Sequence, residues 1–190
     1  MINKSKEFKK NSFNHNRLIF NIILVVYILG LFVGCAFATQ NADNLDFVKQ
    51  ITLTQNIILR PEKRILTANK GYLQRDLAIL TIVLLLKYSG VLKGVSVCIP
   101  FILAVQNSCV YSTLFSEKAV SVFELLFQYI LKDTAVTIIM ILYVHTTIKE
   151  ILARREEVPR DLRKLCAYYL GVLCIYIIDY VIKFAVFPGV

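Results

Sequence analysis

Two charged residues, Asp179 and Lys183, lie four positions apart in the apolar stretch that closes the sequence. On a helix this spacing places both side chains on one face, one turn apart, where they can form an ion pair. The long side chain of Lys183 can reach a membrane interface, whereas Asp179 has to face another helix, a wet cavity or Lys183. Two interpretations stay open: an ion pair that only offsets the cost of burying charge, and a contact to another helix or an ion-handling group.

The other reactive side chains do not form a catalytic or metal-binding pattern. The five cysteines all fall in apolar segments without C-x-x-C spacing, which is typical of small buried side chains rather than of metal ligands or a redox pair. His15 and His145 have no carboxylate at ligand spacing, and no phosphate-binding, serine-hydrolase or zinc-protease motif is present. We predict a protein that is not an enzyme and that needs no metal and no cofactor.

The composition indicates a chain that lives in lipid. Hydrophobic residues make up 57% of the 190 residues, and the formal net charge is +9. The lysines and arginines stand at the ends of apolar runs, where membrane topology places them, rather than in a stripe interleaved with aromatic residues that would suit a nucleic acid. We therefore expect the lipid bilayer, and no nucleic acid, as the surroundings of the chain.

The apolar runs predict an all-α integral membrane protein, a bundle of about five transmembrane helices. A run of about 20 residues reaches roughly 30 Å as a helix, enough to cross a bilayer. A basic tail over 1–17 precedes a single membrane domain over 18–190, and an amphipathic connector over 39–75 is expected to lie on the membrane surface. The expected spans are 18–38, 76–92, 95–115, 134–148 and 165–187.

The segment 119–131 is too short to span alone. It carries a polar stripe on one helical face, formed by Ser121, Glu124, Gln128 and Lys132. It is either a re-entrant or interfacial half-helix or the first half of one long tilted helix that ends near Lys149. Asp133 is suited to cap a new helix, which favours the broken arrangement.

The basic segments 1–17 and 149–164 predict the orientation of the chain. Such segments stay in the cytoplasm, so we expect a multi-pass protein of the cell membrane with a cytoplasmic N-terminus and a C-terminus outside. The connector 39–75 also carries basic residues, but the charge rule weakens in longer loops. The alternative for the first apolar run is a cleaved signal peptide. The length of the run speaks against it, because the apolar part of a signal peptide is shorter.

Small residues recur at four-residue spacing in two places. Gly30, Gly34 and Ala38 follow this spacing on the first expected helix, and Gly90 and Gly94 repeat it at the second hairpin. Such faces let helix backbones approach closely, either within one chain, which is our default, or between chains.

Four features of the sequence form a pattern along the chain. They are "YILGLFVGCAFA", the hairpin "KYSGVLKGVSVCIPFILAVQNSCVYSTLF", the break at "LKD", and a final helix with an acid before Pro188. Together they resemble the stage II sporulation protein M family. The resemblance covers nearly the whole chain through architecture and scattered residues. It places the family's G-x-x-x-G at Gly30 and Gly34 and its last-helix Glu at Asp179, whereas "LKD" and Lys183 depart from the family pattern.

The resemblance implies a non-enzymatic membrane scaffold that anchors and recruits peptidoglycan-degrading partners during forespore engulfment. Those partners would resemble the membrane-anchored sporulation proteins D and P. The alternative is a small membrane transporter or an accessory membrane subunit of an export system, in which Asp179 and Glu124 would line a polar path. A path needs several polar groups converging inside the bundle, whereas a scaffold needs exposed small-residue faces and an outward surface for partners.

Overall fold

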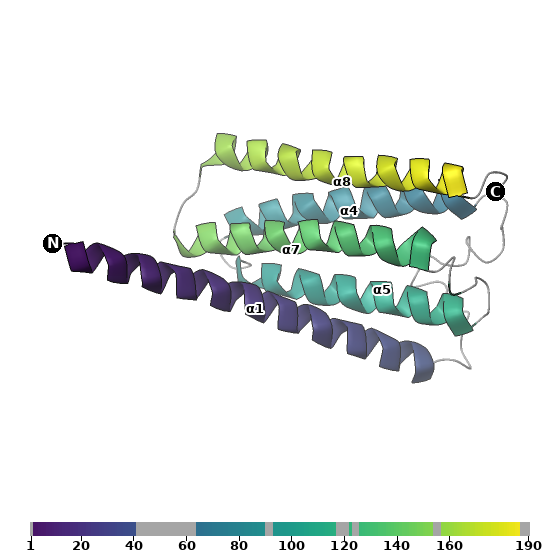
Figure 1. Ribbon diagram of the computed structural model, residues 1–190, viewed down its shortest axis with the longest axis horizontal. Helices are drawn as coiled ribbons and strands as arrows, with labels where there is room; N and C mark the ends of the chain where they lie inside the picture. The colour runs from purple at the N-terminus through teal and green to yellow at the C-terminus, as the bar shows by residue number, and fades with distance from the viewer. Residues whose placement is uncertain are drawn as a thin grey trace.

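The computed structural model describes residues 2–40, 64–89, 93–116, 122, 126–153 and 157–186, and nearly all of them are helical (Figure 1). No strand occurs in these ranges, so the all-α prediction is confirmed for the described part of the chain. A 3-10 turn precedes α5 and a π-helical turn precedes α7. The elements are α1 (Ile2–Gln40), α4 (Arg64–Tyr88), η3 (Lys93–Val97), α5 (Cys98–Ser116), η4 (Leu126–Ile130), α7 (Leu131–Leu152) and α8 (Val158–Val186).

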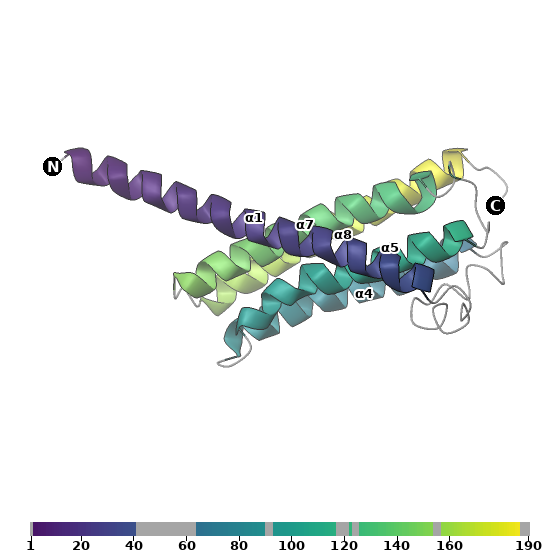
Figure 2. The same ribbon diagram turned by 90° about the horizontal axis from the view of Figure 1, so that it is seen from below.

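Successive long helices run in opposite directions (Figures 1 and 2). The start of α1, the end of α4, the start of α5, the end of α7 and the start of α8 lie toward one end, which we call the N-terminal end of the bundle. The C-terminus lies at the other end. This alternation is the one required of a chain that crosses a bilayer five times.

Four of the five helices are long and apolar enough to cross a membrane, and α4 is the exception. The four qualifying segments are Arg17–Gln40, Gly94–Thr113, Leu131–Leu152 and Val158–Ile182. Helix α4 has 25 residues, about 37 Å at 1.5 Å per residue. It carries Arg75 and Asp76 near its middle and Lys87 in its last turn. The predicted span 76–92 is therefore a helix of sufficient length whose charges need partners inside the bundle.

Several helix boundaries differ from the predicted ones. Helix α1 includes the described part of the tail 1–17, because no Gly or Pro interrupts the sequence there. Helix α4 starts at Arg64, within the expected connector 39–75, of which residues 41–63 lie outside the described ranges. Helix α8 starts at Val158, within the expected basic loop 149–164, because Pro159 is tolerated in a first helical turn.

The predicted break between a half-helix and α7 is absent from the described residues. The turn η4 runs directly into α7, whose preceding residue, Ile130, has helical dihedral angles of −61° and −45°. No side-chain cap is present at that point, because Asp133 is instead engaged by Tyr111, as described below. The described part of segment 119–131 thus follows the alternative of one longer helix, while Glu124 lies outside the described residues.

Helix α7 lies in the middle of the bundle, between the pair α4 and α8 and the pair α1 and α5 (Figure 1). Fully buried apolar side chains come from α1, α4, α7 and α8 and fill the centre. The most enclosed are Ile23, Leu80, Val83, Met140, Val144 and Val172. Dispersion and exclusion from solvent therefore hold the centre together, and charged groups lie above and below it along the bundle axis.

The closest helix pair is α1 with α5, where small residues let the backbones meet. A Cβ atom on Gly30 would lie 2.6 Å from the carbonyl oxygen of Phe101, and one on Gly34 would lie 2.9 Å from Cα of Val105. The thiol of Cys109 donates to the carbonyl oxygen of Gly34 at 3.2 Å. The Gly30 and Gly34 face is thus occupied by another helix of the same chain.

The other small residues behave differently from one another. Ala38 is buried on the same helix. Among the described residues, a Cβ atom on Gly94 would meet nothing within 4 Å, so no described helix approaches closely at this residue. Gly90 lies outside the described residues.

Candidate functional site: buried charges between α4, α7 and α8

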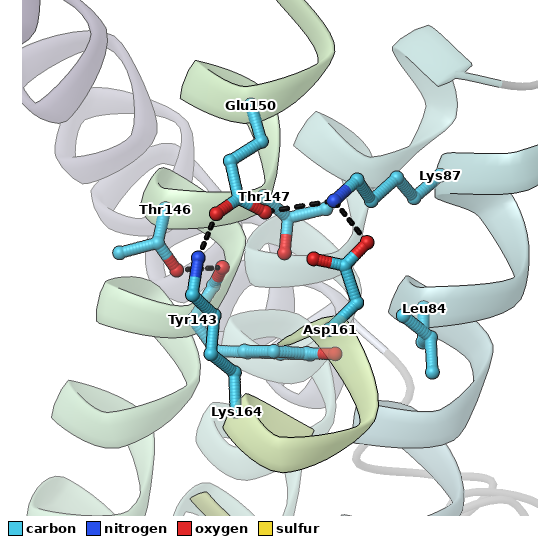
Figure 3. A pocket seen from close by; sticks show the side chains of 8 residues that line it. All are labelled: Leu84, Lys87, Tyr143, Thr146, Thr147, Glu150, Asp161 and Lys164. Atoms are coloured by element: carbon cyan, nitrogen blue, oxygen red, sulfur yellow. Dashed lines mark hydrogen bonds and ion pairs between the residues drawn. The ribbon is translucent and has the colours of Figure 1, made fainter. Parts of the chain in front are cut away.

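A cluster of four charged side chains joins three helices at the N-terminal end of the bundle (Figure 3). We call Lys87, Glu150, Asp161 and Lys164 the Lys87 cluster. The ammonium of Lys87 is paired with Asp161 Oδ2 and lies 2.8 Å from Glu150 Oε2. Lys164 is paired with Glu150 Oε1, and the hydroxyl of Tyr88 donates to Asp161 Oδ2 at 2.5 Å. Two ammonium groups therefore face two carboxylates, and at the edge of the cluster the guanidinium of Arg160 lies between Glu150 and Glu157, at 3.5 and 3.3 Å.

The antiparallel arrangement explains why these residues meet. Lys87 is in the last turn of α4, Glu150 is in the last turn of α7, and Asp161 is in the first turn of α8. These helix ends lie at the same end of the bundle. Lys87 is only 1% exposed, and a buried charge of this kind persists only when it is paired and hydrogen-bonded.

A second group of charges lies farther along α4, close to the middle of that helix. Asp76 is 1% exposed and accepts hydrogen bonds from Nε of Arg75 at 2.9 Å and from the hydroxyl of Tyr176 at 2.7 Å. A second nitrogen of the same guanidinium, Arg75 Nη2, lies 2.8 Å from Asp76 Oδ1. The guanidinium and the phenol together satisfy both carboxylate oxygens, so α4 is tied to α8 at this level.

Helix α7 adds a neighbouring pair of charges, Lys132 and Asp133, and α5 contributes a hydrogen bond to this pair. The hydroxyl of Tyr111 donates to Asp133 Oδ2 at 2.8 Å, and the ammonium of Lys132 lies 3.4 Å from Asp133 Oδ1. Lys132 also lies over the rings of Tyr72 and Tyr176, at 5.0 and 4.9 Å from their centroids, within the range of a cation–π interaction. This pair extends the charged region from α4 and α8 across to α5.

Polar contacts connect α4 to α8 at three levels in antiparallel register, and we call the side-chain pair at each level a step of the polar ladder. From the N-terminal end they are Lys87 with Asp161, Thr81 with Tyr169, and Asp76 with Tyr176. Tyr169 also contacts the carbonyl oxygen of Leu77, at 3.0 Å. Asp76 and Lys87 are separated by about 16 Å along the helix at 1.5 Å per residue. The ladder therefore follows much of the length of the interface.

We expect Tyr176→Phe to lower stability by about 1.5–3 kcal/mol, the range for a hydrogen bond to a charged group. The phenyl ring keeps the packing, but Oδ2 of Asp76 loses its donor in a buried position. Unfolding of the purified protein in detergent, followed by circular dichroism, measures the effect. The control is Tyr180→Phe, since Tyr180 is exposed on the same helix; an equal loss in both variants would contradict the role of the Asp76 contact.

The predicted pair Asp179 and Lys183 is only partly visible. Asp179 is 7% exposed and lies toward α7, where it lines a mostly apolar groove with a volume of about 300 Å³. This is one of the surroundings expected for it, another helix. Both residues belong to α8, but the side chain of Lys183 is outside the described part, so the expected ion pair stays a prediction.

Sequence reasoning missed the Lys87 cluster and the polar ladder because their charges were interpreted as flanking or orienting charges. A signal was present in the periodicity. On α4 the buried residues Tyr72, Asp76, Leu80, Val83 and Lys87 share one helical face. A charge on the same stripe as the apolar core residues indicates a buried partner rather than a lipid-facing or aqueous position.

The described charged side chains attach α4, α7 and α8 to one another. Among the described residues, no group of three or more His, Cys, Asp or Glu side chains is placed to hold a metal ion. The cavity beside the Lys87 cluster measures only about 10 Å³. Comparison with known protein families, curated proteins and solved structures finds no match to this chain.

Proposed function

We propose that this chain is a non-enzymatic, multi-pass protein of the cell membrane that acts as a scaffold for other membrane proteins. One observation carries the proposal: the four charged groups of the Lys87 cluster pair with one another and leave room beside them for no more than about one water molecule. Such an interior fixes the arrangement of helices. A substrate path through the bundle would need a wider polar space.

The outer surface supports the same proposal. In the qualifying segments of α1 and α8 only 22% of the residues are buried, against 50% in that of α5. Large apolar side chains cover these two outer helices, for example Phe32 and Ile177, which are 71% and 62% exposed. In a bilayer these faces contact lipid or the transmembrane helices of partners. The Gly30 and Gly34 face is occupied by α5, so partners would have to use the larger side chains.

The orientation proposed here keeps the N-terminus in the cytoplasm and the C-terminus outside. It is supported by the basic residues at the N-terminal end of the bundle, where Lys149, Arg160 and Arg163 accompany the basic sequence 1–17. The role in forespore engulfment, with membrane-anchored peptidoglycan hydrolases as partners, is supported by the resemblance to the stage II sporulation protein M family alone.

A second candidate, transport or an accessory role in export, is favoured by the polar ladder. Titratable side chains inside a membrane bundle commonly mark ion or proton routes. Asp76, Lys87 and Asp161 are all at most 3% exposed and stand along one interface. This candidate requires the paired groups to exchange protons or ions, which the scaffold does not.

Two assays on one set of membranes distinguish these functions. The purified protein is reconstituted in vesicles that contain a pH-sensitive dye, and in parallel it is cross-linked in native membranes before isolation. The scaffold expects no proton flux above protein-free vesicles and the recovery of membrane-anchored enzymes that degrade peptidoglycan. A proton flux that Asp76→Asn abolishes, without recovery of such enzymes, would contradict the scaffold and favour transport.

We expect Asp179→Asn to be tolerated better than Asp179→Leu. An amide can still form hydrogen bonds to a neighbouring helix, whereas leucine leaves any polar partner unsatisfied. Membrane migration around the forespore in a complementation assay, with protein abundance measured alongside, tests this order. An Asn variant that is abundant but inactive would show that the titratable group itself is required, as an ion route demands.

A further inference from the structure

A small cavity lies where α4, α7 and α8 meet at the Lys87 cluster (Figure 3). Its volume is about 10 Å³, close to the smallest space that holds one water molecule. Its walls come from the ends of three helices and are largely polar. They consist of Leu84, Lys87, Tyr143, Thr146, Thr147, Glu150, Asp161 and Lys164.

Two buried polar atoms in this wall have no hydrogen-bond partner among the described residues. They are Oδ1 of Asp161 and the hydroxyl oxygen of Tyr143, on side chains that belong to residues only 3% exposed. The other carboxylate oxygen of Asp161 is fully engaged, by Lys87 and Tyr88. A buried polar atom left without a partner costs on the order of 1–3 kcal/mol, so two such atoms beside one cavity point to a ligand in it.

We infer that one water molecule is bound in this cavity and joins Tyr143 on α7 to Asp161 on α8. The hydroxyl of Tyr143 donates to the water oxygen, and one water hydrogen is donated to Oδ1 of Asp161. Buried waters typically make about three such bonds to polar groups that would otherwise be unsatisfied. The remaining water hydrogen faces a wall that includes two threonines and Glu150.

The charges around the cavity favour water over a cation. Asp161 and Glu150 could bind a monovalent ion, but the ammonium of Lys87 already stands between them. Lys164 supplies a second positive charge at Glu150. Arg160 also pairs with Glu150, at 3.5 Å, so an added cation would bring a further positive charge to carboxylates that are already paired, whereas a water adds hydrogen bonds and no charge.

The direction in which one substitution shifts the thermal unfolding midpoint tests whether the water is bound. Tyr143→Phe keeps the ring, which packs on Tyr168 at 4.7 Å between centroids, and removes only the hydroxyl. If the water is present, the variant loses a hydrogen bond and its thermal unfolding midpoint falls by about 2–4 °C. If the cavity is empty, the variant loses an unsatisfied buried hydroxyl, and its midpoint stays level or rises, which would overturn the inference.

Tyr168→Phe is the matched control, because Tyr168 is outside the cavity wall. This variant is expected to shift the unfolding midpoint less than Tyr143→Phe does.

Unfolding midpoints measured in sodium chloride and in choline chloride at equal ionic strength distinguish a bound water from a bound cation. Equal midpoints in the two salts are expected. A rise in sodium alone that Asp161→Asn removes would replace the water by a sodium ion and overturn the inference, as would an experimental structure that resolves ordered waters and leaves this cavity empty.

Discussion

Lys87→Met is expected to lower the stability of the protein by about 3–5 kcal/mol, because it leaves a buried carboxylate without its counter-charge. Lys87 is 1% exposed and is paired with both Asp161 and Glu150. Glu150 keeps Lys164 and Arg160, so Asp161 is the group left uncompensated, with the Tyr88 hydroxyl as its remaining side-chain donor. The loss is measured as a shift of the unfolding transition in a mixed-detergent titration followed by circular dichroism.

A matched control and a rescue variant test whether the loss comes from the pairing of Lys87 with Asp161. Lys164→Met removes an ammonium from the same cluster, but the Lys164 side chain is 37% exposed, so the expected loss is below about 1 kcal/mol. In the double variant Lys87→Met with Asp161→Asn, the uncompensated charge is gone and at least half of the loss should return. Similar losses for Lys87→Met and Lys164→Met, or a double variant that is less stable than Lys87→Met, would contradict the proposed pairing.

Gly34→Leu is expected to separate α1 from α5 and to reduce the amount of protein in the membrane severalfold. Even the first added atom, Cβ, would clash with the side chain of Ser108 and with the backbone of Val105. A backbone cannot move aside as a flexible side chain does, so the whole helix would have to shift. Overpacking of this kind costs typically 1–3 kcal/mol, and more where the backbone is rigid.

Ala36→Leu provides the control for added bulk on the same helix. Ala36 is exposed, so a larger side chain there faces outward and should leave abundance and unfolding unchanged. Protein level in isolated membranes and the detergent unfolding transition are compared for the two variants. Equal behaviour would show that the G-x-x-x-G face is not in contact with α5.

The length and spacing of apolar runs predicted the helices because each run had to be long enough to cross a bilayer. Boundaries were less predictable. The basic residues of 149–164 suggested a loop, yet α8 starts at Val158 within it, because Pro159 is accepted in the first turn of a helix. Asp133 suggested a cap, yet its carboxylate is used by Tyr111 across the bundle, a contact between residues on different helices that local sequence does not specify.

The Lys87 cluster could not be located by spacing because its members come from three helices. Asp161 and Lys87 are separated by 74 positions, and only the antiparallel packing of α4 on α8 brings them together. In contrast, Gly30 and Gly34 stood out because a single helix holds the whole motif. The sequence does indicate that Asp76 and Lys87 share the buried face of α4, and this face predicts partners without identifying them.

We propose that α4, despite its charges, crosses the membrane as one of five helices. In a variant whose five native cysteines are replaced by serine, single cysteines at Gly71 and at Gly94 test it, because a Cβ atom at either site meets nothing within 4 Å. We expect an impermeant maleimide to label Gly71→Cys in intact cells and to label Gly94→Cys only after the membrane is opened. Labelling of both cysteines from the same side would contradict the crossing of α4 and with it the five-helix arrangement.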